Sequence, residues 1–496
     1  MKLNILHSLE IMQDYDSYVI PFTSPAVMAD FFEEDFCNLV KPYIDSGLFK
    51  AKKGEIYSFT SFFKGTSKHV NIVLAGFGEE KDLTADTLMN GFGKAVTSLQ
   101  SLKAEKPLVF MENIAPCVNK VDSFLKSCKA MILAEYAFER YQTKEDKTKR
   151  IDSIDIYSEY YEAPRCEKRA SLLADNTIIA RDLVNEPSNF MKPEDLADKV
   201  KEILSGLSLD IDIYDEEAIR KFGMTAFLSV AKGSSAKPRL IVINYRGNKS
   251  SDEKLALVGK GLTYDSGGYS IKPTDSMITM KTDMAGSAAV VGAIKSIAEA
   301  KLRVNVVAVI AACENMISGE AYLPGDLIGS MAGKFIEVVN TDAEGRLTLA
   351  DAVTFARENE KATKIIDIAT LTGAVLSALG LDYAGIVTNS EELYKIVEKA
   401  SKMSNEKIWR LPLDESIKER NKSEIADLKN SGGKYAGSST AGAFIGEFVN
   451  DTPWVHIDIA GTSAAEKDIP YCRKGGTGYG VELLFDIASQ INKIKD

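Results

Sequence analysis

Histidine is scarce in this chain of 496 residues, which contains three: His7, His69 and His456. A Ser-His-Asp triad needs a histidine beside its nucleophile, and many catalytic zinc sites are built on two or three histidines. His7 and His69 lie in a region without a chemical motif, and His456 alternates with apolar residues in WVHIDIAG (454–461), a pattern typical of a structural imidazole. Both kinds of site are therefore nearly excluded, and a metal site here would have to use oxygen ligands, with or without a lysine amine.

A surplus of basic residues, paired cysteines and long apolar runs are also missing. The 60 basic residues are outnumbered by 71 acidic ones, which disfavours nucleic acid as a partner because phosphate-binding surfaces need clustered Lys and Arg. The longest apolar run, VNVVAVIAAC (304–313), is about half as long as a membrane helix. The six cysteines form no CxxC pair, and the apolar patch near the N-terminus is too short for an export signal. We therefore expect a soluble, cytoplasmic protein with reduced thiols and no membrane segment.

Chain length and the pattern of apolar segments predict two α/β domains. A chain of 496 residues is too long for one ordinary core. Short apolar strands alternate with helical patterns in residues 1–150, and the alternation is stronger in residues 171–496, where near-continuous apolar strands predict a central mixed sheet covered by helices on both faces. The stretch 151–170 is charged and poor in aliphatic clusters, which is typical of a linker. The prediction is a small N-terminal α/β domain (1–150), a linker (151–170) and a larger C-terminal catalytic domain (171–496).

Three loops near the ends of predicted strands carry an unusual number of charged side chains. VGKGLTYDSGGYSIKP (258–273) contains Lys260, Asp265 and Lys272; MKTDMAGSAA (280–289) contains Asp283; NTDAEGRL (340–347) contains Asp342, Glu344 and Arg346. Ligands of open α/β sheets bind where strands end and loops begin. We therefore expect these side chains to converge on one site.

The four carboxylates of these loops would repel one another unless cations lay between them, and their pKa values would rise. Two divalent ions balance the four negative charges, and paired ions about 3.5–4 Å apart suit hydrolysis by an activated water. Lys260 is a costlier ligand because only the neutral amine has a lone pair, and neutralising it at pH 7 costs roughly 4–5 kcal/mol. Metal binding displaces ligand protons and could offset that cost.

Other interpretations of these stretches are weaker. DSGG (265–268) echoes the nucleophile segment of trypsin-like proteases, but Tyr264 stands where that segment has Gly, and no histidine lies in a suitable context. GKG (259–261) looks like the start of a dinucleotide fingerprint, but position 264 is not Gly and the next stretch is not helical. NTDAEGRL could also be a solvated turn that caps the next helix, an interpretation that the other two charged loops disfavour.

The motifs resemble those of the M17 leucyl aminopeptidase family of cytosolic exopeptidases. The resemblance rests on VGKGLTYDSGGYSIKP, MKTDMAG, NTDAEGRLTLADA, DIATLTGAVLSALG (367–380), HIDIAG (456–461) and GGTGYGV (475–481). It covers about residues 170–496 and is most specific at NTDAEGRL. The N-terminal region resembles the family only in its position and α/β character.

The resemblance implies a role for each charged residue of the three loops. Asp265, Asp342 and Glu344 would bind a readily exchanged metal ion, and a tighter ion would be bound by Lys260, Asp265, Asp283 and Glu344. Asp265 and Glu344 would thus bridge the two ions.

The same resemblance implies that Lys272 and Arg346 are catalytic. Lys272 would donate to the substrate carbonyl or to the oxyanion formed from it, and Arg346 would bind a bicarbonate ion that serves as general base. Arg346 lies at the start of a predicted helix, and helix N-termini favour anions. The first side-chain pocket of the substrate would be surrounded by Met280, Asn340, Thr370 and Gly373.

The implied activity is that of a metal-dependent aminopeptidase, which removes the N-terminal residue from peptides with a free amine through a water activated by two metal ions. Leu, Met and other apolar residues would be preferred, broadly, because one methylene changes binding by only about 1–3 kcal/mol. The ligands should accept Zn²⁺, Mn²⁺ or Co²⁺, and the family forms homo-hexamers. A catalytically silent scaffold is disfavoured by the intact ligand set, and a two-metal phosphoesterase by the shortage of histidine.

Overall fold

The computed structural model describes residues 1–8, 14–62, 69–143 and 150–491, which form two compact units. The first unit contains Met1–Ile178 and Ala465–Lys474, and the second contains Ile179–Ala464 and the chain from Gly475 onward. Among the described residues, none of the helices combines the length and the apolar character that crossing a membrane requires.

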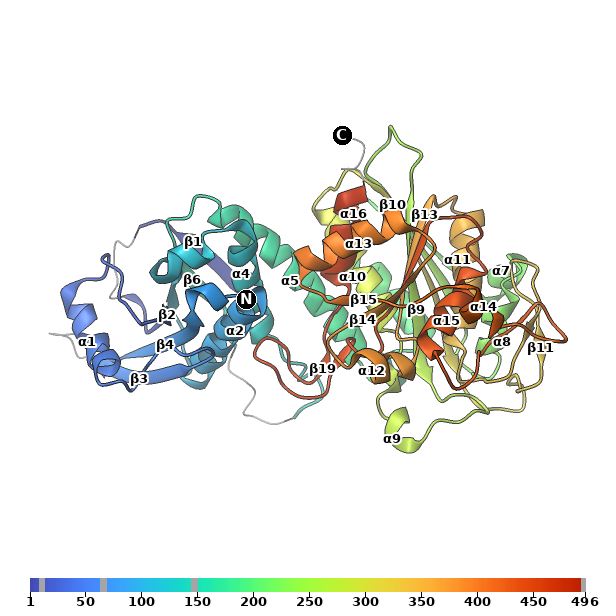
Figure 1. Cartoon of the computed structure of the whole chain (residues 1–496), viewed down its shortest axis with the longest axis horizontal. Helices are drawn as coiled ribbons and strands as arrows, with labels where there is room; N and C mark the ends of the chain where they lie inside the picture. The colour runs from blue at the N-terminus through green and yellow to red at the C-terminus, as the bar shows by residue number, and fades with distance from the viewer. Residues whose placement is uncertain (9–13, 63–68, 144–149, 492–496) are drawn as a thin grey trace. The chain divides into compact units, whose positions relative to one another are not determined.

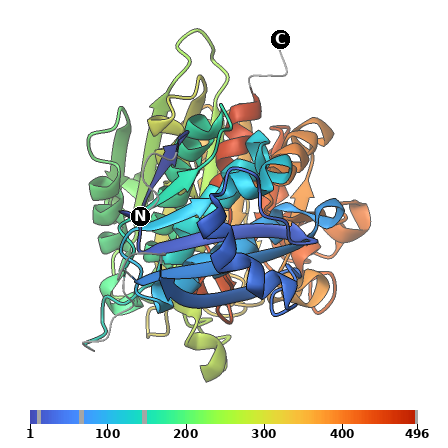
Figure 2. The same ribbon diagram turned by 90° about the vertical axis from the view of Figure 1, so that its left-hand side faces the viewer.

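The first unit is built on a sheet with the strand order β1-β6-β5-β2-β4-β3, seen face-on in blue in Figure 2. Strand β3 runs antiparallel to β4, and the other described neighbours are parallel. Its strands are β1 (Lys2–Leu6), β2 (Ser17–Ser24), β3 (Ile56–Phe62), β4 (His69–Glu79), β5 (Pro107–Phe110) and β6 (Ser153–Tyr157). Its helices are α1 (Glu34–Asp45), α2 (Ala85–Ser101), α3 (Ala115–Val118) and α4 (Val121–Glu135), with short 3₁₀ turns η2 (Glu80–Asp82) and η3 (Met111–Ile114).

Residues 151–170, assigned above to a linker, belong to regular structure instead. Strand β6 pairs with both β1 and β5, and Ala163 begins the long helix α5 (Ala163–Asn185). In β6 the apolar Ile154 and Ile156 are buried and alternate with half-buried polar residues, which is the period-two pattern of a strand. The charged composition of this stretch concealed that alternation. The boundary between the two units falls inside α5, after Ile178.

The second unit is built on an eight-stranded sheet with the order β15-β14-β17-β13-β9-β10-β8-β7. The strands of this unit are β7 (Asp210–Tyr214), β8 (Arg239–Arg246), β9 (Leu255–Asp265), β10 (Asn305–Asn315), β11 (Leu327–Ile328), β12 (Ile336–Glu337), β13 (Lys364–Ala369), β14 (Ala384–Thr388), β15 (Ile408–Arg410), β16 (Leu428–Lys429), β17 (Trp454–Asp458) and β19 (Gly475–Gly476); the boundary after Ala464 falls inside β18 (Ala464–Ala465). Its helices after α5 are η4 (Ser188–Phe190), α6 (Pro193–Ile203), α7 (Glu216–Lys221), α8 (Thr225–Ala231), α9 (Thr274–Met277), η5 (Met280–Thr282), α10 (Ala285–Glu299), α11 (Gly345–Glu358), α12 (Gly373–Leu379), α13 (Glu391–Ser404), α14 (Glu415–Glu419), α15 (Gly437–Gly446) and α16 (Val481–Ile491).

The large sheet is mixed and is covered on both faces. Strands β17, β13, β9 and β10 are parallel neighbours, whereas β14 and β8 run antiparallel to β17 and β10. Helices α10, α13 and α16 lie on one face, and α8, α11 and α15 on the other (Figure 1). Every residue of β10 is buried, as expected for a strand covered on both sides. The predicted mixed α/β fold is confirmed.

Glycines at the contact between helix and sheet bring α10 close to β9 and β13. A Cβ atom at Gly286 would lie 2.1 Å from the carbonyl oxygen of Ile368, and one at Gly259 would lie 2.7 Å from the Cα atom of Ser287. Larger residues at either position would push the helix away from the sheet. Lys260 follows Gly259 and Asp283 lies just before α10, so this close packing keeps the two charged side chains near each other.

Candidate active site

The charged loops converge at the C-terminal ends of the parallel strands. β9 ends at Asp265 and carries Lys260 five residues earlier, between neighbours β10 and β13. Asp283 comes from the turn before α10, and Asp342 and Glu344 come from the turn before α11. Since α10 and α11 cover opposite faces of the sheet, the site forms where their N-terminal ends meet the ends of the strands.

Lys260 is the most deeply buried cation of this cluster, with 3% of its side chain exposed. Its Nζ lies 2.8 Å from Asp283 Oδ2 and 3.0 Å from Glu344 Oε1, and it donates a hydrogen bond to the carbonyl oxygen of Thr370 at 2.9 Å. The backbone of Gly345 passes so close that a Cβ atom there would lie 2.5 Å from Lys260 Cε. A larger residue at Gly345 would therefore displace the Lys260 side chain.

Lys272 lies between the two other carboxylates. Its Nζ is 2.9 Å from Asp265 Oδ2 and 2.6 Å from Asp342 Oδ1, and 16% of its side chain is exposed. Asp265 is oriented by two further donors, because its Oδ1 accepts hydrogen bonds from Asn315 Nδ2 and from the backbone N–H of Gly267, both at 2.8 Å. Contacts with both of its oxygens thus define the orientation of the Asp265 carboxylate.

The carboxylates lie close enough together to bind a metal ion, and one of their oxygens accepts no hydrogen bond from the described residues. Asp265, Asp342 and Glu344 each offer an oxygen, and these atoms all lie within 4.8 Å of one another. Glu344 is 2% exposed, yet its Oε2 accepts no hydrogen bond from the described residues. A buried carboxylate oxygen without a donor is costly unless a cation lies beside it. These residues therefore fit divalent cations.

Burial and mutual repulsion disturb the protonation of the cluster. Burial raises the pKa of Glu344, and the charge of Asp265 adds to the effect. Burial also raises the pKa of Asp283, although the Lys260 ammonium opposes it. For Lys260 itself burial opposes the charge, but Asp283, Glu344 and Asp265 outweigh it and raise its pKa. The lysines thus stay charged and act as counter-ions to the carboxylates.

Arg346 occupies the first turn of α11 and is 7% exposed. One terminal guanidinium nitrogen donates to the carbonyl oxygen of Asn430 at 2.9 Å, but Nε has no hydrogen-bond partner among the described residues. Burial lowers its pKa to about 10, while the charges of Glu344 and Asp458 oppose that change. A buried guanidinium with an unused N–H suits an oxyanion.

The four residues predicted around a substrate pocket differ in their surroundings. Thr370 touches the charged cluster directly, since its hydroxyl donates to Asp283 Oδ1 at 2.8 Å. Asn340 Oδ1 accepts from the backbone N–H of Asp342 at 2.9 Å and so shapes the turn. Met280 begins η5, three residues before Asp283, and is half-buried. Gly373 begins α12 and is exposed, with no atom within 4 Å of where its Cβ would be.

Two buried asparagines belong to the site although the sequence analysis did not single them out. Asn315 bridges two ligand loops, because its Nδ2 donates to Asp265 and also to the carbonyl oxygen of Thr341 at 3.0 Å. It ends a long apolar strand, the same signal that identified Asp265. Asn430 accepts from Arg346 through its carbonyl oxygen and donates from Nδ2 to the carbonyl oxygen of Asn340 at 2.6 Å. It lies in KNSGGK, where no apolar strand precedes it to mark it as a site residue.

His456 has the contacts of a structural imidazole. It is fully buried in β17, and its Nδ1 lies 2.6 Å from Asp367 Oδ1, while Trp454 Nε1 donates to the other oxygen of Asp367 at 2.5 Å. These three side chains tie β17 to β13. Among the described residues, His456 forms no hydrogen bond or ion pair with the carboxylate cluster.

Family models match both parts of the chain. The model described as "Cytosol aminopeptidase family, catalytic domain" matches residues 178–485, and that of the "Cytosol aminopeptidase family, N-terminal domain" matches residues 23–145. The chain belongs to the cytosol aminopeptidase family. The resemblance to M17 enzymes inferred from the motifs is confirmed, and it extends to the N-terminal region.

Relatives and solved structures agree with this membership. The chain is 48% identical over 451 residues to a probable cytosol aminopeptidase of Clostridium perfringens, covering 89% of this chain and 90% of the relative. A probable cytosol aminopeptidase of Clostridium tetani is 48% identical over 448 residues, covering 89% and 91%. The bottromycin maturation enzyme BotP in complex with Mn has a TM-score of 0.85 at 26% identity, over 96% of this chain and 99% of that one.

Membership in the cytosol aminopeptidase family makes the protein a metal-dependent aminopeptidase, a hydrolase that acts on peptides. The residues that converge here lie within the matched catalytic domain. A role as a catalytically silent scaffold is not favoured.

Proposed function

We propose that this aminopeptidase cleaves the N-terminal residue from peptides at a centre of two divalent ions, held by Lys260, Asp265, Asp283, Asp342 and Glu344. The observation that carries the proposal is the pairing of two ammonium groups with carboxylates from different loops. Lys260 Nζ lies within 3.0 Å of Asp283 and Glu344, and Lys272 Nζ within 2.9 Å of Asp265 and Asp342. Oxygen ligands that hold two cations so closely suit two divalent ions.

The proposed ligand roles follow from position and charge. Asp265 and Glu344 would bridge the ions, as the family resemblance implies. When bound, the ions polarise the scissile carbonyl and lower the pKa of water. Lys260 would bind as a neutral amine, and because its carboxylate neighbours raise its pKa, it would release a proton only as the metal binds.

Lys272 differs from Lys260 in its access to substrate. Its side chain is 16% exposed against 3% for Lys260, so its ammonium reaches the open side of the site. Asp265 and Asp342 raise its pKa above the ordinary value against the effect of burial, which keeps it charged at neutral pH. We assign it the donation of a hydrogen bond to the substrate carbonyl and to the oxyanion that forms from it.

Arg346 is proposed to hold bicarbonate, which would supply the general base of the reaction. The support is its buried guanidinium, whose Nε has no hydrogen-bond partner among the described residues, and its position two residues after Glu344, the N-cap of the same helix. The carbonyl oxygen of Asn430 accepts a hydrogen bond from a terminal nitrogen of the same guanidinium. The residue's task is thus to place an anion beside the carboxylate cluster and not to bind a metal ion.

The remaining proposals concern substrate, ions, assembly and location. The acidic cluster with its ions suits a free α-amine, and Met280, Asn340, Thr370 and Gly373 would line a pocket for Leu, Met and other apolar side chains. The ions would be Zn²⁺ or Mn²⁺, with Co²⁺ accepted, since the ligand atoms are mostly oxygens. We further propose a homo-hexamer in the cytoplasm, following the family resemblance.

The deciding experiment is cleavage of leucine p-nitroanilide and of its N-acetyl form by metal-stripped protein, before and after adding Mn²⁺ or Zn²⁺. We expect cleavage of the free-amine substrate alone, and only with metal. Cleavage of both substrates would contradict recognition of the amine. No cleavage with any of the ions, in protein shown by circular dichroism to be folded, would contradict the proposed centre and favour a scaffold.

A further inference from the structure

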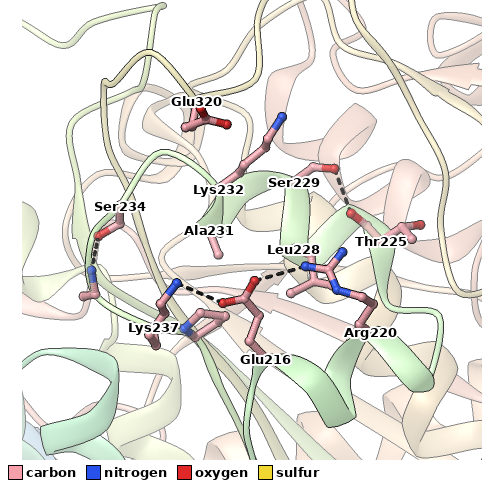
Figure 3. A pocket seen from close by; sticks show the side chains of 12 residues that line it. Glu216, Arg220, Thr225, Leu228, Ser229, Ala231, Lys232, Ser234, Lys237 and Glu320 are labelled. Atoms are coloured by element: carbon pink, nitrogen blue, oxygen red, sulfur yellow. Dashed lines mark hydrogen bonds and ion pairs between the residues drawn. The ribbon is translucent and has the colours of Figure 1, made fainter.

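A second concave site lies in the same unit, beside α7 and α8 (Figure 3). Its volume is about 400 Å³, within the range of small-molecule sites. The walls come from α7, α8 and the segment that follows α8 up to Pro238, and Glu320 from the loop after β10 completes them. None of the proposed metal ligands lines this pocket.

One side of the pocket carries a surplus of positive charge. Glu216 forms ion pairs with two cations, Arg220 at 3.0 Å and Lys237 at 3.2 Å, drawn as dashed lines in the lower part of Figure 3. One carboxylate cannot neutralise both cations, so one positive charge remains for a ligand. Both cationic side chains are mostly exposed, so a ligand in the pocket can reach either of them.

Two further charged groups lining the pocket have no side-chain partner in the described parts of the chain. Among the described residues, neither the Lys232 ammonium, at the end of α8, nor the Glu320 carboxylate takes part in a hydrogen bond or ion pair. Figure 3 shows both in its upper part, away from the ion pairs of Glu216. Leu228, Ala231 and Pro238 supply apolar surface to the same pocket.

We propose that this pocket binds an acidic α-amino acid, a ligand with two carboxylates and one ammonium. The two available positive charges, one on Lys232 and one shared by Arg220 and Lys237, match the carboxylates. Glu320 matches the ammonium, and the apolar wall matches the methylene groups between them. Charge-assisted hydrogen bonds of this kind are the stronger ones in proteins. The proposal concerns a site separate from the metal centre.

The pocket is connected to the metal centre by two hydrogen bonds and the peptide link between Glu314 and Asn315. Ser234 lines the pocket, and its hydroxyl donates to Glu314 Oε2 at 2.6 Å, while Lys192 Nζ contacts Glu314 Oε1 at 2.7 Å. The next residue, Asn315, donates to Asp265 at 2.8 Å. A ligand carboxylate that takes the Ser234 hydroxyl away from Glu314 acts on the end of β10, where Asn315 orients a proposed metal ligand. Occupancy of the pocket should therefore change the activity.

The binding test is calorimetric titration of the metal-loaded protein with L-glutamate, compared with L-glutamine and glutarate, which lack one carboxylate and the ammonium respectively. We expect saturable binding of glutamate, and affinities lower by about tenfold or more for the other two ligands. Lys232→Met should weaken glutamate binding by about tenfold or more, whereas the control Lys221→Met should change it less than about twofold. Lys221 is a suitable control because it is exposed and pairs with Glu217 outside the pocket. No saturable binding up to about 10 mM, or equal binding by the Lys232 variant, would overturn the proposal.

The activity test uses leucine p-nitroanilide with and without glutamate at saturating metal. The activity test rests on the proposed function, because it needs aminopeptidase turnover, whereas the calorimetric binding test does not. We expect glutamate to change kcat/KM by about twofold or more in the natural protein and not in Ser234→Ala, which keeps every proposed metal ligand. An effect that persists in Lys232→Met would show competition at the active site and overturn the link. If glutamate binds but the activity does not change, the link between the pocket and the metal centre is overturned, whereas the binding site itself stands.

Discussion

Replacing Asn315 with alanine tests how buried hydrogen bonds hold the metal ligands. Asn315 is fully buried at the end of β10 and donates to Asp265 Oδ1 at 2.8 Å and to the carbonyl oxygen of Thr341 at 3.0 Å. Both acceptors keep another donor in the variant: Gly267 N–H at 2.8 Å for Asp265, and the Tyr322 hydroxyl at 2.9 Å for Thr341. The fold should therefore survive, while Asp265 loses part of its orientation.

The expected loss of metal affinity can be bounded in two ways. A hydrogen bond to a charged group contributes about 1.5–3 kcal/mol, which corresponds to roughly 10–150-fold. Removing a residue that orients a metal ligand typically costs about 10–100-fold in affinity. Because the N–H of Gly267 still donates to the same oxygen of Asp265, the loss should lie at the lower end of these two ranges. We therefore expect metal affinity to fall by about tenfold.

The assay is a titration of metal-stripped protein with buffered Zn²⁺ or Mn²⁺, following bound metal and aminopeptidase activity together. Asn305→Ala is the matched control, since Asn305 lies at the other end of β10 and donates to the carbonyl oxygens of Asn248 and Ser251 at 2.9 and 2.7 Å. The Asn305→Ala variant should have a lower free energy of unfolding but an unchanged metal affinity. Unchanged metal affinity in Asn315→Ala, or an equal loss in both variants, would refute the idea that Asn315 orients Asp265.

Three further predictions concern single residues of α11 and its N-terminal turn. Arg346→Ala should lose at least about tenfold in kcat yet keep both metal ions, because a residue that only holds an anion is not a ligand; metal analysis showing depletion would contradict its role. Glu344→Gln should lose metal as well as turnover, since a bridging oxygen loses its charge, and a fully metallated, active variant would argue against the bridge. Asp351 is buried away from the metal ligands and accepts hydrogen bonds from the backbone N–H groups of Phe227 and Met331. Burial raises the pKa of Asp351 to about 7, although these N–H groups oppose the change. Its unfolded pKa is about 3.9, so the folded state binds more protons between these values and stability falls as pH rises towards 7. Asp351→Asn removes this titration, so the free energy of unfolding of the variant relative to the natural protein should rise by about 2 kcal/mol from about pH 5.5 to about pH 8, measured by denaturation at fixed metal. A constant difference across that range would show that Asp351 does not titrate there.

The sequence allowed the α/β class and most strands of the large sheet to be predicted, because strands buried on both faces are continuous apolar runs. VNVVAVIAAC coincides with most of β10, and KIIDIAT with β13. Where burial is uneven the prediction was less accurate. FIEVVN (335–340) forms only the two-residue strand β12, with Phe335 and Val339 exposed. Residues 151–170 were assigned to a linker because their charge hid the alternation in β6.

The membership of Ala465–Lys474 in the first unit could not be read from the sequence either. This segment follows the last long strand, β17, by only a few residues, and its composition resembles that of the surrounding loops. Contacts between segments that are distant along the chain leave no periodic pattern in either of them. Only the folded chain shows which unit such a segment joins.

The sequence by itself determined the chemistry that is available: few histidines in the chain, and four carboxylates, three lysines and an arginine in three loops, in motifs specific enough to indicate the family. Tertiary structure decided which of these groups touch. The close approach of α10 at Gly286 places Asp283 against Lys260, and Asn315 brings the loops of Asp265 and Thr341 together. The reason is physical: residue type sets charge and donor capacity locally, whereas distances of 2.6–3.0 Å between segments far apart in the chain arise only when helices and strands pack.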